Sequence, residues 1–192
     1  MSGLEIERKF LVKKGDAFKR AAFSCSHIKQ GYIPCDNATV RIRLRKSELL
    51  PEMEASPTGG KATGRRDSGN GLEGAFLTIK GRSVDGGLSR YEFEKEITKD
   101  EAENLLKLCR GGVIDKHRYL VKSGEHTFEV DEFHGDNEGL LMAEVELSNP
   151  DEPFKKPDFI GPEVTGDRRF YNRHMLKCPF SLWRDTLPEE FR

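Results

Sequence analysis

Apolar and polar residues alternate with a period of two along most of this chain. In the stretch TVRIRLRK, Val40, Ile42 and Leu44 alternate with three arginines, and seven other segments show the same rhythm. This period is typical of β-strands, in which successive side chains point to opposite faces. The pattern predicts eight strands, at about residues 4–12, 28–33, 39–46, 75–82, 89–97, 113–121, 126–133 and 140–147.

Helical signals are fewer and more local. Thr98 and Glu101 have the spacing of a capping box, an apolar stripe follows, and two glycines end the segment, which predicts a helix over 98–110. Shorter helices are expected near 15–23 and 166–177. The expected fold class is therefore α+β, mainly antiparallel β, with helices beside the sheet.

The chain length suits one domain spanning 1–192. Residues 46–74 contain 13 Gly, Pro, Ser and Thr residues among 29, which predicts a flexible insertion between two strands. Residues 148–165 contain four prolines and are expected to be an extended connector. The stretch 166–192 is expected to be a helical tail, and residues 178–192 within it, which include Trp183, are expected to pack on the outside of the sheet or on a partner subunit.

Composition limits the functional classes. Charged residues make up 34% of the chain, against about 25% in an average protein, yet 32 bases and 33 acids nearly cancel. This balance argues against a general polyanion-coating protein, so no nucleic-acid partner is expected. Four dispersed cysteines and the lack of a long apolar run predict a cytoplasmic protein without membrane attachment. The five histidines have no metal-ligand spacing along the chain and are expected to be structural.

The charges are segregated by strand as well as by face. Acidic residues gather on the predicted first, seventh and eighth strands, and basic residues on the third, fourth and sixth. On any single strand, a solvent-exposed polar face explains the pattern. Across all the strands, clustered carboxylates favour a bound cation and clustered bases favour a multiply charged anion. Eight strands closed into a tunnel-like barrel would place this charged set inside and the apolar set outside, under the helices.

Several short motifs resemble those of the CYTH, or triphosphate tunnel metalloenzyme, superfamily. The first strand carries the ExExK pattern in LEIERKF, and the later segments follow in the family's order over residues 4–147. The matching segments are QGY at 30–32, VRIR at 40–43, LTIK at 77–80, RYEFE at 90–94, KHRY at 116–119, FEVD at 128–131 and AEVE at 143–146. Within the superfamily, the chain looks most similar to the small bacterial inorganic triphosphatases.

The resemblance implies a closed eight-stranded tunnel that binds a triphosphate beside Mg²⁺ or Mn²⁺. The residues it implies as metal ligands are Glu5, Glu7, Glu144 and Glu146, with Glu129 and Asp131 nearby. The residues it implies as the phosphate-binding set are Lys9, Arg41, Arg43, Lys80, Arg90, Lys116 and Arg118. An ordinary salt bridge remains an alternative for each of these bases.

The same resemblance implies a catalytic role for Lys9 and Tyr32 in activating water, although Tyr32 could also be a packed aromatic residue. The expected reaction is metal-dependent hydrolysis of the terminal phosphate of inorganic triphosphate. An organic triphosphate is the alternative substrate, for a class IV adenylate cyclase or a thiamine triphosphatase. A non-catalytic polyphosphate-binding module is a third possibility. The protein is expected to be a monomer or a homodimer.

Overall fold

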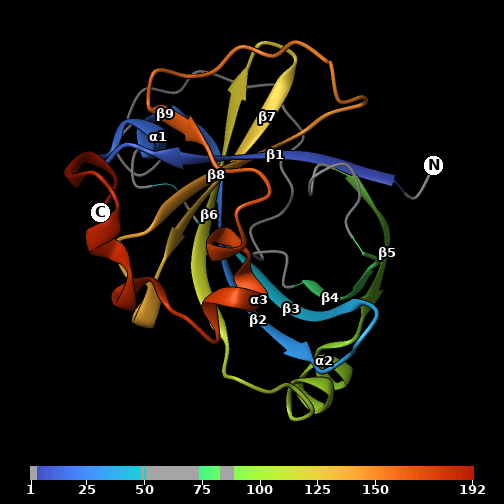
Figure 1. Cartoon of the computed structure of the whole chain (residues 1–192). Helices are drawn as coiled ribbons and strands as arrows, with labels where there is room; N and C mark the ends of the chain where they lie inside the picture. Colours follow the sequence, from blue (N-terminus) through green and yellow to red (C-terminus); the bar gives the residue numbers. More distant parts are fainter. Residues whose placement is uncertain (1–3, 49, 51–73, 83–88) are drawn as a thin grey trace, which may run out of the picture.

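The computed structural model describes residues 4–48, 50, 74–82 and 89–192. Its described part contains one antiparallel sheet with a few short helices, an α+β fold (Figure 1). The strands are β1 (Leu4–Val12), β2 (Ala22–Ile33), β3 (Thr39–Glu48), β4 (Gly74–Lys80), β5 (Ser89–Ile97), β6 (Ile114–Ser123), β7 (His126–Phe133), β8 (Leu141–Glu146) and β9 (Ile160–Glu163). Their order is β5-β4-β3-β2-β6-β7-β8-β1-β9, and β1 also pairs with β5 over Leu4–Ile6.

All eight predicted strands are present within a few residues of their expected bounds. The main difference is β2, which begins at Ala22 rather than near 28, because its first half pairs with both β3 and β6. The ninth strand, β9, lies in the proline-containing connector and was not predicted; it pairs with Phe10 and Val12 of β1. Most of the predicted insertion at 46–74 lies outside the described residues.

The helices follow the sequence signals unevenly. Helix α1 (Ala17–Ala21) and helix α2 (Lys99–Leu106) form where expected, and Thr98 and Glu101 make the reciprocal capping box. The predicted helix over 166–177 is wrong: the segment holds only the 3₁₀ turn η4 (Arg168–Phe170) and the four-residue helix α3 (Asn172–Met175). The helix is interrupted at Tyr171, whose backbone is extended between η4 and α3, and Phe170 and Met175 on either side of it are both buried.

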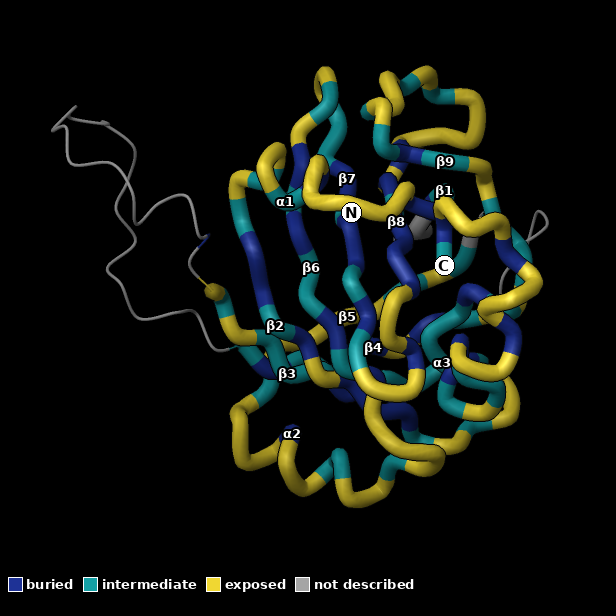
Figure 2. Tube along the Cα trace, turned by 90° about the vertical axis from the view of Figure 1, so that its left-hand side faces the viewer, coloured by how far each residue is buried: buried dark blue, intermediate teal, exposed yellow. Residues whose placement is uncertain are grey.

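Much of the outward face of the sheet is apolar and covered, as the strand pattern predicted, but apolar side chains of β5 are exposed there. One core lies on β1, β6, β7 and β8 and includes Phe10, Phe128 and Val145, with Phe18 of α1 packed against it. A smaller core joins β3 and β4 to α2, whose remaining surface faces solvent (Figure 2). No helix in the described part of the chain has the length and apolarity to cross a bilayer.

The C-terminal tail packs elsewhere than expected. Its side chains Phe170, Phe180 and Trp183 form a core with Leu11 and Met142. These two strand residues are Cα partners two positions from the Lys9–Glu144 pair, so they share the face of the charged residues. The tail therefore fills one end of the charged face, and its expected place on the outer surface is a wrong prediction.

Candidate active site

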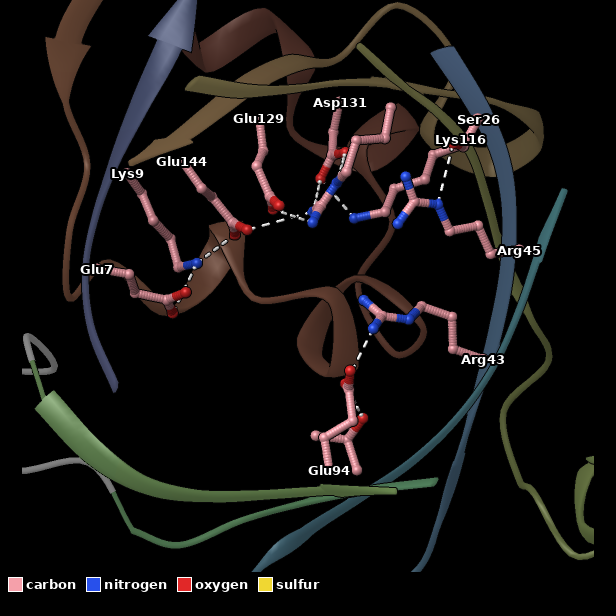
Figure 3. Close-up of polar contacts among 12 residues, drawn as sticks. Glu7, Lys9, Ser26, Arg43, Arg45, Glu94, Lys116, Glu129, Asp131 and Glu144 are labelled. Atoms are coloured by element: carbon pink, nitrogen blue, oxygen red, sulfur yellow. Dashed lines mark hydrogen bonds and ion pairs between the residues drawn. The ribbon is translucent and has the colours of Figure 1, made fainter. Parts of the chain in front are cut away.

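Strand register places the predicted charged residues opposite one another. Lys9 of β1 lies across from Glu144 of β8, which lies across from Glu129 of β7, and Arg118 of β6 lies across from Asp131. Because side chains at directly paired positions point to the same face, alternation alone gathers acids and bases on one side of the sheet. Figure 3 shows these side chains converging from several strands.

Lys9 lies between two carboxylates. Its Nζ is 3.0 Å from Glu7 Oε1 and also contacts Glu144 Oε1, and all three side chains are at most 13% exposed. Burial alone would lower the pKa of Lys9, but Glu144 and Glu7 outweigh it and raise the pKa above its ordinary value. Lys9 is therefore a firmly protonated ammonium when these carboxylates are its only partners.

Arg118 connects the remaining acids of this group. Its guanidinium donates to both carboxylate oxygens of Asp131 at 2.7 Å, and also contacts Glu129 and Glu144. Lys116 Nζ donates to the same Asp131 at 2.5 Å. Burial opposes ionisation of Glu144, but Lys9 and Arg118 hold its pKa well below the usual range. The three acids of this group therefore each contact a base, and the bases favour the ionised form of Glu144.

A second charged group lies on β3, β4 and β5. Arg41 and Arg43 donate to Glu94 Oε2 at 3.3 and 2.9 Å, and Lys80 lies 2.7 Å from Glu92. Burial, together with neighbouring Arg41, lowers the pKa of Arg43 to about 10. Both acids lie on the charged face predicted for the fifth strand, although the sequence did not identify them as site residues.

The end of β1 joins the two groups. Arg90 of β5 donates to Glu7 Oε1 at 2.8 Å, and its Cα is paired with that of Glu5, whose side chain lies outside the described residues. Glu146 is the Cα partner of Glu7, but it is exposed. Thus Glu7 and Glu144 lie at the centre of the predicted metal-ligand set, whereas Glu146 lies at its rim.

Tyr32 is buried near this cluster. Gln30 Nε2 donates to its hydroxyl oxygen at 2.7 Å, and burial raises the pKa of Tyr32 to about 12. The phenol is therefore neutral at physiological pH. Its ring also belongs to the core formed with the C-terminal tail, so the ring packs against apolar side chains while the hydroxyl makes a hydrogen bond.

A cavity of about 980 Å³ lies between the charged face of the sheet and the C-terminal tail. Its lining includes Lys9, Tyr32 and Arg118 together with residues of the tail that sequence reasoning did not identify. The tail residues that line it are Gly166, Arg168, Tyr171, Asn172, Arg173, His174 and Lys177. The cluster of bases in GDRRFYNRHMLK, residues 166–177, could have indicated an anion-binding segment. Its place beside the cavity depends on how the tail packs at the end of the sheet.

The fold and this cavity define a class of protein with an antiparallel sheet whose charged face opens onto a cavity lined by both acids and bases. The CYTH domain model matches residues 3–171, and the chain belongs to this family. Two similar proteins are inorganic triphosphatases. That of Acetivibrio thermocellus is 40% identical over 95% of this chain and 99% of its own length. That of Nitrosomonas europaea is 31% identical over 88% of this chain and 94% of its own.

A solved structure supports the same assignment. The crystal structure of the inorganic triphosphatase NE1496 superimposes with a TM-score of 0.53, covers 93% of this chain and 94% of that one, and shares 26% sequence identity. The match extends over nearly the full length of both proteins.

Proposed function

We propose that this protein is a divalent-metal-dependent inorganic triphosphatase that hydrolyses the terminal phosphate of triphosphate inside a tunnel. The observation that carries the proposal is one cavity whose lining includes acids such as Glu7 and Glu144 together with bases such as Arg90 and Lys80. The short β1–β5 ladder would complete the tunnel wall. The similarity to two inorganic triphosphatases supports this substrate.

The acidic group has the donor chemistry for Mg²⁺ or Mn²⁺. Both ions prefer carboxylate oxygens, and the ammonium of Lys9 already lies between Glu7 and Glu144. We propose that these two residues are the principal ligands, with Glu5, Glu146, Glu129 and Asp131 completing or supporting the set. A bound ion would polarise phosphate oxygens and offset their charge.

The basic group would bind the phosphates by exchanging partners. Each of these bases of the predicted phosphate-binding set contacts an acid. The pairs are Arg41 and Arg43 with Glu94, Lys80 with Glu92, Arg90 with Glu7, and Lys116 and Arg118 with Asp131. Phosphate oxygens are stronger multivalent acceptors, and an arginine can bind them in a bidentate manner. The bases of the predicted phosphate-binding set are therefore held in place before an anion binds.

Lys9 and Tyr32 are proposed to position and activate the attacking water. The water oxygen forms a bond to the terminal phosphorus, its proton passes to the neutral amine of Lys9, and the bridging P–O bond breaks so that pyrophosphate leaves. Lys9 can act as a base only if a cation draws Glu7 and Glu144 away from its ammonium, because those carboxylates raise its pKa. Tyr32, neutral and accepting from Gln30, retains its own proton for donation.

The test is a phosphate-release panel of tripolyphosphate, ATP, thiamine triphosphate and pyrophosphate with Mg²⁺ or Mn²⁺. We expect tripolyphosphate to be hydrolysed fastest, to pyrophosphate and phosphate, and no turnover in EDTA. Cyclic AMP as the main product from ATP, or preferred cleavage of thiamine triphosphate, would replace the substrate assignment. Tight binding of tripolyphosphate with no turnover would indicate a binding module.

A further inference from the structure

Three histidines that are distant in the sequence meet on the outward face of the sheet. His27 of β2 and His117 of β6 are direct Cα partners, and their rings stack with centroids 4.8 Å apart. His134, just after β7, packs edge-on against His117 with centroids also 4.8 Å apart. These residues have no ligand spacing along the chain, because they come from or directly follow three separate strands.

This cluster is separate from the tunnel. Positions 27 and 117 have the opposite strand parity to Ser26 and Arg118, so their side chains point away from the charged cavity. Among the residues that the structure describes, His27, His117 and Glu48 are the set whose ligand atoms all lie within 4.8 Å of one another. Glu48 is the last residue of β3, which makes the cluster a junction of three strands.

We propose that His27, His117 and Glu48 form a second metal site, for a borderline divalent ion such as Zn²⁺. Two imidazoles and one carboxylate are a common three-ligand set for zinc, which takes water in its fourth position. His117 Nε2 and Glu48 Oε2 lie 3.1 Å apart, close to the roughly 3.4 Å between two ligands that each lie about 2.1 Å from one tetrahedral ion. A ligand atom of His27 lies within 4.8 Å of those of both His117 and Glu48.

The surroundings match those of a metal site beyond its direct ligands. Asp115 Oδ1 lies 2.6 Å from Nε2 of His27, and His134 Nε2 lies 2.6 Å from Nδ1 of His117. Such partners fix the tautomer and orientation of a ligating imidazole, which leaves its other ring nitrogen for the ion. Glu138 in turn lies 3.4 Å from His134. The three ligand side chains are 25–39% exposed, so an ion can reach them from solvent.

The donor atoms also predict selectivity. Imidazole nitrogen favours Zn²⁺, Cu²⁺ and Ni²⁺, whereas Mg²⁺ favours all-oxygen sites such as the tunnel carboxylates. Excess Mg²⁺ should therefore occupy the tunnel and leave the outward site to Zn²⁺. This separation allows the two sites to be measured independently.

The experiment is equilibrium dialysis of the untagged full chain against Zn²⁺ in the presence of millimolar Mg²⁺. We expect about one bound Zn²⁺ per chain for the wild type and for Glu144→Gln, and loss of that ion in both His27→Gln and His117→Gln. Asp115→Asn should weaken binding about 10- to 100-fold, the usual effect of losing an outer partner of a ligand. His126→Gln is the matched control, because its partner is Glu152, outside the cluster.

A second measurement uses Co²⁺ in place of Zn²⁺. A four-coordinate visible absorption band should appear in the wild type and be absent in His27→Gln, with both proteins folded by circular dichroism. Hydrolysis of triphosphate by His27→Gln in Mg²⁺ should be unchanged. Failure of the wild type to retain Zn²⁺ against Mg²⁺, or equal retention by both histidine variants, would overturn the site without affecting the proposed activity.

Discussion

Glu144 and Glu146 share a strand and a face, yet their environments differ. Glu144 is 13% exposed and contacts both Lys9 and Arg118, whereas Glu146 is exposed at the rim. We therefore predict that Glu144→Gln weakens Mg²⁺ binding and turnover more than Glu146→Gln does. Losing one charged contact of about 1.5–3 kcal/mol corresponds to roughly a 10- to 150-fold loss. Steady-state rates across a Mn²⁺ titration should show partial rescue of both variants, and equal losses would contradict this ranking.

Arg43 should behave differently, because it belongs to the basic group and contacts Glu94 rather than the acids that we propose as metal ligands. Arg43→Ala should lower kcat/KM by roughly 10- to 150-fold through the loss of a charged contact to phosphate. High Mn²⁺ should not restore it. Arg20→Ala, on an exposed position of α1, is the control and should be silent. Rescue of Arg43→Ala by metal would mean that the cation lies nearer β3 than we propose.

Lys116 gives the site a pH dependence. Burial, reinforced by Arg118, lowers its pKa from 10.5 to about 8 even though Asp131 opposes the shift. As pH rises through about 8, the free protein loses this positive charge, so triphosphate binds less well and kcat/KM should fall. The alkaline limb should be absent in Lys116→Gln. A cation near Asp131 would move the limb to lower pH, and an unchanged limb in the variant would assign it to another group.

At the scale of elements, the tail is part of the core rather than an appendage. Trp183 packs edge-on against Phe170 and Phe180 and donates to the Cys178 carbonyl at 3.2 Å. Trp183→Ala should cost about 3–5 kcal/mol of unfolding free energy, as large-to-small core changes do. Its neighbour Leu182 is 73% exposed, so Leu182→Ala should cost under about 0.5 kcal/mol. Urea titrations followed by circular dichroism would measure both, and similar values would contradict this packing.

The sequence was informative wherever a residue's environment depends on strand parity. Alternation alone placed Lys9, Arg118 and Glu144 on one face, and the capping box located α2. The sequence pattern could not locate the C-terminal tail, because a short apolar stripe does not specify which end or face of the sheet that stripe covers. It also missed Glu94, whose partnership with Arg43 depends on how β3, β4 and β5 align.

For the whole molecule, the internal pairing of the tunnel charges has a thermodynamic consequence. Triphosphate alone must take bases such as Arg118 and Lys116 from Asp131, leaving a buried carboxylate without its partners. A cation alone must likewise displace Lys9 from Glu7 and Glu144. Either ligand alone therefore leaves a buried side chain charge without its partner, whereas the cation and the triphosphate together supply partners for both the acids and the bases. Metal and triphosphate should bind cooperatively, each raising the affinity of the other by the same factor.

We predict that a non-hydrolysable triphosphate analogue binds at least about 10-fold more tightly with saturating Mg²⁺ than in EDTA, a coupling of about 1.4 kcal/mol or more. The two ligands together should also raise the melting temperature by more than the sum of their separate effects, because only the ternary complex satisfies both charged groups. Titration calorimetry and thermal unfolding would measure this. Glu144→Gln should reduce the coupling, since it removes a carboxylate shared by Lys9 and Arg118. Additive shifts in the wild type would show that the two groups bind their ligands independently.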